Sequence, residues 1–176
     1  MSRPLFDASL LAQDVVATVP AGLELRPLAS DDYARGHLSV LAHLTASPDV
    51  GEPAWSAQFA RLAAINTATA DDGPTYLPVV VVDRAADEIV ASASLVVERK
   101  FLRGAAKCGH VEDVVVDPRL QGKKLGLLLL TVLTRLSESQ GCYKTILDCD
   151  PKNEAFYVKC GYENKGCEMA KYAEKK

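Results

Sequence analysis

The stretch from Gly109 to Gly126 constrains the fold more than any other part of the chain. Its β-branched run Val114–Val116 is typical of a buried strand, and Asp117-Pro118 ends that strand because proline has no amide proton to donate. After Gly126 the apolar residues recur at helical spacing. A turn rich in glycine and lysine that feeds a helix presents free backbone N–H groups, so we expect a phosphate-binding turn here.

The strand carries two adjacent carboxylates. Strict alternation places His110 and Glu112 on one face of the strand, and Val111, Asp113 and Val115 on the other. A carboxylate in a central strand is costly unless it is paired or used. Two interpretations stay open at this point: an ion-paired strand residue, or a carboxylate that binds an amine or helps to remove its proton.

Length and composition narrow the class of protein. The 176 residues suit one domain, and 48% hydrophobic with 24% charged residues is typical of a soluble globular protein. A net charge of −3 argues against nucleic-acid and membrane partners. The sequence shows neither a membrane-spanning run nor a signal peptide, so we expect a cytoplasmic protein, with an organellar location as the open alternative. We expect residues 1–20 to be an N-terminal extension and residues 21–176 to be the folded domain.

The five cysteines form no CxxC pair and the three histidines are scattered, so we expect neither a disulfide framework nor a metal site.

The remaining segments predict a mixed α/β domain with one sheet. Strands are expected at residues 23–28, 76–82, 89–99, 144–149 and 168–172. Helices are expected from a Ser30-Asp31-Asp32 cap through residue 44, over 52–67 and 124–140, and from Asp150-Pro151 to Cys160-Gly161.

Two motifs carry chemistry besides the strand carboxylates. The turn Gln121–Gly126 with its two lysines indicates a pyrophosphate, and it is neither a P-loop nor GxGxxG, which disfavours nucleoside triphosphates and dinucleotides. The segment Leu147–Asp150 precedes the aromatic pair Phe156-Tyr157. Such a pair is more often core than catalysis, but a tyrosine beside a leaving thiolate could stabilise or protonate the sulfur.

Taken together, these residues resemble a known family. The strand–turn–helix unit resembles the acetyl-CoA signature Gln/Arg-x-x-Gly-x-Gly/Ala of the GNAT superfamily of N-acetyltransferases. Residues 109–117, 141–144, 147–150 and 153–162 further resemble the glucosamine 6-phosphate N-acetyltransferases within it, and the similarity covers nearly the whole chain. The resemblance implies the GNAT fold, a single mixed and mostly antiparallel sheet flanked by helices. It also implies direct acetyl transfer from acetyl-CoA to D-glucosamine 6-phosphate in a ternary complex, towards UDP-N-acetylglucosamine. A homodimer would complete the sites.

The same resemblance assigns roles to residues. Those implied in catalysis are Glu112, Asp148 and Tyr157. Those implied in acetyl-CoA binding are Val114, Val115, Val116, Gly122, Lys123, Lys124, Leu125, Gly126, Leu127, Asp148, Asn153 and Tyr157. Those implied in sugar-phosphate binding are Thr45, Lys100, Arg103, Glu112, Asp113, Val114, Tyr143 and Lys144, the last two across the dimer.

The chain departs from the family pattern at two places. Lys124 stands where the signature has its first glycine, and we expect it to add a cation for the pyrophosphate rather than to crowd the turn. Residues 170–172 read Ala-Lys-Tyr where the family tends to place a phosphate-contacting arginine, so that contact is not carried over. Two alternatives remain: the same fold acting on another amine, such as a protein N-terminus or a polyamine, and a non-catalytic acyl-CoA-binding module.

Overall fold

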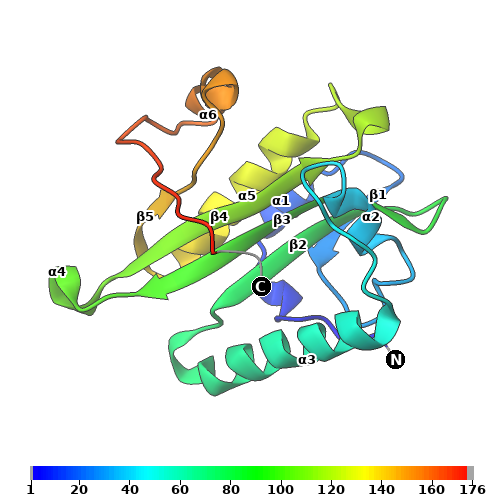
Figure 1. Cartoon of the computed structure of the whole chain (residues 1–176), viewed down its shortest axis with the longest axis horizontal. Coiled ribbons are helices and arrows are strands. Elements are labelled where there is room, and N and C mark those ends of the chain that lie inside the picture. The colour runs from blue at the N-terminus through cyan, green and yellow to red at the C-terminus, as the bar shows by residue number, and fades with distance from the viewer. Residues whose placement is uncertain (1, 174–176) are drawn as a thin grey trace.

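Within residues 2–173, which the computed structural model of the chain describes, five strands form one sheet in sequence order (Figure 1). Neighbouring strands are antiparallel from the first to the fourth, and the fourth and fifth are parallel. The mixed, mostly antiparallel sheet predicted from the sequence is therefore confirmed. The strands are β1 (Leu23–Pro27), β2 (Tyr76–Asp83), β3 (Glu88–Arg99), β4 (Lys107–Val116) and β5 (Cys142–Ile146).

Helices cover both faces of this sheet. The two long helices, α3 and α5, lie on opposite faces, and α6 follows β5 at the edge of the molecule (Figure 1). No helix in the described part of the chain is long and apolar enough to cross a membrane. The helices are α1 (Gln13–Val16), α2 (His37–Leu41), α3 (Glu52–Ala68), α4 (Leu102–Ala105), α5 (Leu125–Ser139) and α6 (Glu154–Lys159). Short 3-10 turns cover Ala8–Leu10, Ala70–Asp72, Pro118–Leu120 and Pro151–Asn153.

Each face of the sheet has its own apolar core. On one face the wide leucine stripe of α5, including the fully buried Leu129 and Leu133, packs on the inward side chains of β2 and β3. On the other face Trp55 and Phe59 of α3 pack on Val80. A fully buried leucine contributes roughly 1.5–3 kcal/mol relative to an exposed one, so these two layers fix the sheet firmly. Apolar residues before β1 join both cores: Leu5, Phe6, Leu11 and Val15.

The helix predicted from Ser30 is wrong at its start, because α2 begins only at His37. Asp32 does not cap a helix. Its carboxylate is fully buried and accepts hydrogen bonds from Arg26 at 2.7 Å on both oxygens and from the Ala29 N–H at 2.7 Å. A buried carboxylate needs such partners, so this tertiary anchor overrides the local capping signal.

Two strand predictions also need correction. The fifth strand covers 142–146 rather than 144–149, so Leu147–Cys149 lies beyond it. Residues 168–172 form no strand; Met169 and Tyr172 are each 90% exposed, in a segment that loops back in front of the molecule (Figure 1). A strand needs a neighbour for its backbone groups, and this segment has none within the described chain.

The predicted alternation along β4 fails after Glu112. Ser94 pairs with Glu112 but Ser92 pairs with Val115, so β4 contains one extra residue. Asp113 adopts a left-handed φ of 54°, as the bulged residue of such an irregularity does. Val111 therefore joins the α5-side core while Val115 joins the α3-side core, although alternation predicted one face for both.

Candidate active site

The site is organised by the separation of β4 from β5. The two strands pair at Lys107 with Cys142 and at Gly109 with Thr145, and the pairing ends at His110 with Ile146. Beyond that point the strands diverge (Figure 1), and the β5-facing edge of β4 has no strand partner among the described residues. The backbone groups of 114–116 on this edge can therefore bond an extended, amide-containing molecule.

The predicted phosphate turn follows directly. Gly122 has φ 82° and Lys124 has φ 61°, and α5 begins at the next residue. The first bond of the helix runs from the Leu128 N–H to the Lys124 carbonyl at 3.0 Å. The N–H groups of 125–127 consequently have no carbonyl of a preceding helical turn to bond, and they form the positive end of the helix dipole. An anion suits this place.

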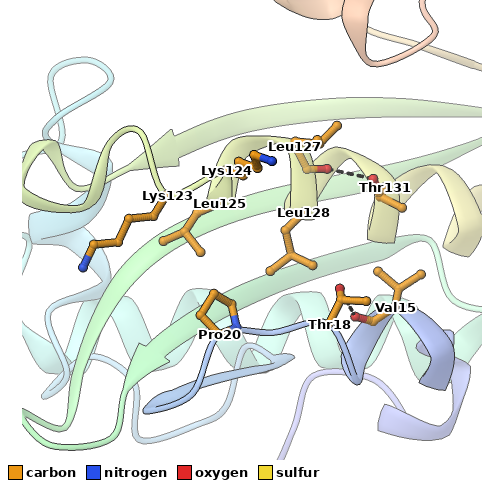
Figure 2. Close-up of a pocket in the computed structure, with 9 residues that line it drawn as sticks. All are labelled: Val15, Thr18, Pro20, Lys123, Lys124, Leu125, Leu127, Leu128 and Thr131. Atoms are coloured by element: carbon orange, nitrogen blue, oxygen red, sulfur yellow. Dashed lines mark hydrogen bonds between the residues drawn. The ribbon is translucent and has the colours of Figure 1, made fainter.

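Gly126 is needed for packing. A Cβ added there would lie 3.2 Å from the Phe156 ring, so the missing side chain lets α6 approach the first turn of α5. On another side of the same turn is a cavity of about 350 Å³, bordered by the N-terminal segment and by both lysines. Figure 2 shows Leu125 and Leu128 directed from α5 towards Pro20 and Thr18.

A histidine gathers three carboxylates from three strands of the sheet or their ends. His110 Nε2 lies 3.3 Å from Glu112 and 3.3 Å from Asp148, which follows β5. His110 Nδ1 lies 3.4 Å from Glu98 of β3, and Glu98 is also ion-paired with Lys100. This ion pair raises the pKa of Lys100 and lowers the pKa of Glu98. Two of the predicted catalytic residues, Glu112 and Asp148, are thus brought together.

The predicted sugar-phosphate cations gather near the start of β5. The Arg103 guanidinium lies 5.0 Å from the centre of the Tyr143 ring, and the Lys144 ammonium lies 5.6 Å from it. Both distances suit cation–π contacts. Arg103 reaches this position from the turn between β3 and β4, where its φ is 55°. Lys100, at the end of β3, connects this group to the carboxylates through Glu98.

Tyr157 and Cys149 both keep their protons at neutral pH, which suits Tyr157 as a proton donor and makes Cys149 a poor nucleophile. Tyr157 is half-buried beside Phe156 and Tyr162, and its burial raises its pKa, so the phenol keeps its proton at neutral pH. Burial and the neighbouring carboxylates also raise the pKa of the Cys149 thiol. Since the thiolate is the nucleophilic form of cysteine, Cys149 is poorly suited to accept an acyl group.

Other predicted residues stand apart. Thr45 lies in the exposed loop after α2 and Asn153 at the start of α6, and within the described chain neither side chain hydrogen-bonds to another predicted site residue. Asp113 borders a second cavity of about 200 Å³ under α2 and α3. Sequence reasoning gave Glu98 and His110 no role. The signal was available in the strand register, which puts both on the face of Glu112.

Comparisons with known proteins agree with one another. The acetyltransferase (GNAT) family matches residues 40–162. A relative from Oryza sativa subsp. japonica, named "Probable glucosamine 6-phosphate N-acetyltransferase 2", is 43% identical over 159 residues, covering 89% of this chain and 92% of that protein. Glucosamine 6-phosphate N-acetyltransferase 1 of Dictyostelium discoideum is 38% identical, covering 88% and 93%. The crystal structure of glucosamine-6-phosphate N-acetyltransferase from Arabidopsis thaliana has a TM-score of 0.78 and 37% identity, covering 85% and 97%.

Proposed function

The chain belongs to the acetyltransferase (GNAT) family, and on that premise we propose that it transfers the acetyl group of acetyl-CoA to the amine of D-glucosamine 6-phosphate. The choice of acceptor rests on one observation: a cluster of carboxylates lies next to a cluster of cationic side chains. Carboxylates around His110 suit an amine, while Lys100 and Arg103 of the same chain, joined by Lys144 of a second copy, suit a phosphate. An acceptor with both an amine and a phosphate matches this arrangement.

The donor side has the form that acetyl-CoA requires. The free edge of β4 at Val114, Val115 and Val116 suits the amide-containing pantetheine arm. The turn and first helical residues suit the pyrophosphate through their N–H groups and two ammonium groups. We assign to the turn Gly122, Lys123, Lys124, Leu125, Gly126 and Leu127, and to the reactive end of the arm Asp148, Asn153 and Tyr157.

The chemistry is a direct transfer in a ternary complex. The attacking amine must be neutral, and Glu112 and Asp148 take up the proton that the ammonium loses, directly or through water. As the nitrogen–carbon bond forms and the carbon–sulfur bond breaks, Tyr157 gives its phenolic proton to the sulfur. The second proton, which the nitrogen loses as the amide forms, restores the phenol through water. The raised pKa of Tyr157 keeps that proton available, and the raised pKa of Cys149 disfavours an acyl-enzyme.

The acceptor residues extend beyond these groups. We assign Thr45, Lys100, Arg103, Glu112, Asp113, Val114, Tyr143 and Lys144 to the sugar phosphate. Tyr143 and Lys144 act across a homodimer in this proposal. The 44% exposure of Tyr143, at the outer edge of the sheet, supports a partner there. A monomeric mass at working concentration would refute the dimer.

Three broader assignments accompany the reaction. We assign residues 21–176 to the acetyltransferase domain and residues 1–20 to an N-terminal extension, whose apolar side chains Leu5, Phe6, Leu11 and Val15 pack into the cores of that domain. The product enters the synthesis of UDP-N-acetylglucosamine. The compartment is the cytoplasm, whose reducing conditions suit the five free cysteines.

A thiol-release assay tests the function. Acetyl-CoA is supplied with glucosamine 6-phosphate, with glucosamine, or with a peptide or polyamine amine. Fast release with the phosphorylated sugar and slow release with the others is expected. No release with the phosphorylated sugar refutes the proposal, and fast release with another amine would identify a different acceptor. Equal rates with glucosamine 6-phosphate and with glucosamine would refute the roles of Lys100, Arg103 and Lys144.

A further inference from the structure

We propose that His110 is a positioning residue that holds the carboxylates of Glu112 and Asp148 at one place for the incoming amine. The inference rests on the proposed function, and it adds a residue to which that function gave no part. His110 would not touch the substrate. It would act by fixing the two groups that do.

The imidazole is enclosed by acceptors on both sides. Its Nε2 atom is buried and has no partner at regular hydrogen-bond geometry, yet it lies 3.3 Å from both Glu112 and Asp148. Its Nδ1 atom lies 3.4 Å from Glu98. A buried polar nitrogen without a partner is unusual and calls for an explanation. The two carboxylates supply it, because each lies at ion-pair distance from Nε2 and neither is aligned with that nitrogen at the expense of the other.

The position of His110 in the sheet explains why a bridge is needed there. His110 with Ile146 is the last paired position of β4 and β5. Glu112 lies beyond it on one diverging strand, and Asp148 lies beyond it on the chain that leaves the other. No backbone ladder sets the distance between these two carboxylates. The imidazole at the point of divergence contacts both, so it sets that distance.

The exposure of His110 and of the two carboxylates agrees with this role. The His110 side chain is 20% exposed, whereas Glu112 and Asp148 are 48% and 53% exposed. The histidine is the enclosed centre, and the carboxylates keep faces open for a substrate. On its far side, Nδ1 reaches Glu98 and through it Lys100, which we assign to the sugar phosphate. One network therefore spans from the phosphate end of the site to its amine end.

Three substitutions separate the contacts of the two ring nitrogens. The amide of His110→Gln can place a donor near the Nε2 position, and the amide of His110→Asn near Nδ1. His110→Leu supplies neither. Misplacing a reacting group by about 1 Å can cost on the order of a hundredfold in rate. We expect His110→Leu to lower kcat for glucosamine 6-phosphate by tenfold or more and His110→Asn by nearly as much. His110→Gln should stay within about threefold of the unaltered enzyme.

The KM for acetyl-CoA should stay within about twofold in all three variants, a separation that general damage to the fold would not produce. Thermal unfolding of each variant accompanies the kinetics, and His43→Gln, which alters an exposed histidine, is the matched control. Full activity of a folded His110→Leu variant would overturn the inference, and so would a His110→Gln variant as slow as His110→Asn. If His110→Leu does not fold, the comparison of Gln with Asn decides. An unaltered enzyme that releases no thiol contradicts the proposed function itself, whereas an active one with an unaffected Leu variant contradicts only the role of His110.

Discussion

Replacing Lys124 by glycine should make the protein more stable and its acetyl-CoA binding weaker. Lys124 has φ 61° and ψ 18°, a left-handed conformation that costs a residue with a side chain roughly 1–2 kcal/mol. Glycine adopts it freely, but glycine also gives the unfolded chain more freedom, which offsets about 0.4–1 kcal/mol. The net gain should therefore lie between about 0 and 1.6 kcal/mol, and its centre of about 0.8 kcal/mol corresponds to roughly 2–3 °C in Tm for a domain of this size.

The loss of affinity follows from the loss of the ammonium group. Lys124 is exposed and borders the cavity beside the turn, where a charge pair is worth about 0.2–1 kcal/mol. Removal of this cation should therefore raise the KM for acetyl-CoA up to about fivefold, since 1.4 kcal/mol corresponds to tenfold. The increase should shrink as salt is added, because salt screens exposed charges.

Lys124→Ala is the matched control, because alanine removes the charge but keeps the strained backbone. Thermal unfolding without ligand should show a higher Tm for the glycine variant than for the alanine variant. Both variants should share the raised KM. Equal Tm values for the two variants would refute the strain argument, and an unchanged KM in both would refute the cation.

Three further predictions concern other parts of the molecule. Tyr157→Phe should lower kcat by tenfold or more with little change in acetyl-CoA affinity, because it removes the proposed proton donor; an unchanged kcat in the thiol-release assay would exclude Tyr157 from the mechanism. Gly126→Ala should lower the free energy of unfolding by about 1 kcal/mol more in the presence of Phe156 than in the Phe156→Leu background, since the added Cβ would lie 3.2 Å from that ring. A double-mutant cycle measured by urea unfolding that shows no coupling would contradict this. Burial lowers the pKa of His37 to about 4, so as pH falls below about 6.5 the unfolded chain binds this proton first and stability decreases until about pH 4. Between pH 7 and pH 5, His37 should lower the free energy of unfolding by about 2 kcal/mol. The loss of unfolding free energy over this pH range, measured with urea, should be smaller by that amount in His37→Gln.

The sequence predicted those elements whose local signals agree with their tertiary surroundings. The leucine stripe of α5 and the Asp150-Pro151 start of the last helical segment are examples. Asp150 caps that start by accepting from the Lys152 N–H, and Gly161 ends the segment with φ 89°. Nothing distant competes with these signals, so pattern and structure coincide.

The errors have a common cause in long-range contacts. Asp32 stands where a helix cap is expected from the sequence, but its carboxylate forms an ion pair with Arg26 instead. The extra residue at Asp113 leaves no mark in a run of valines, and only the pairing with β3 reveals it. The candidate site follows the same rule. Its residue types were readable one by one, whereas the role of His110 depends on where two strands part.

If acetyl-CoA binds where we propose, along the unpaired edge of β4, the stability of the enzyme should depend on its supply of acetyl-CoA. Amides that no neighbouring strand protects open and exchange with solvent more easily than those inside the sheet. With the donor along that edge, the folded state gains RT ln(1 + [L]/Kd), about 2.7 kcal/mol at a hundred times Kd. The backbone amides of residues 114–116 should therefore exchange with solvent more slowly in the enzyme saturated with acetyl-CoA than in the free enzyme. In a cell depleted of acetyl-CoA, the enzyme would lose turnover and resistance to proteolysis together.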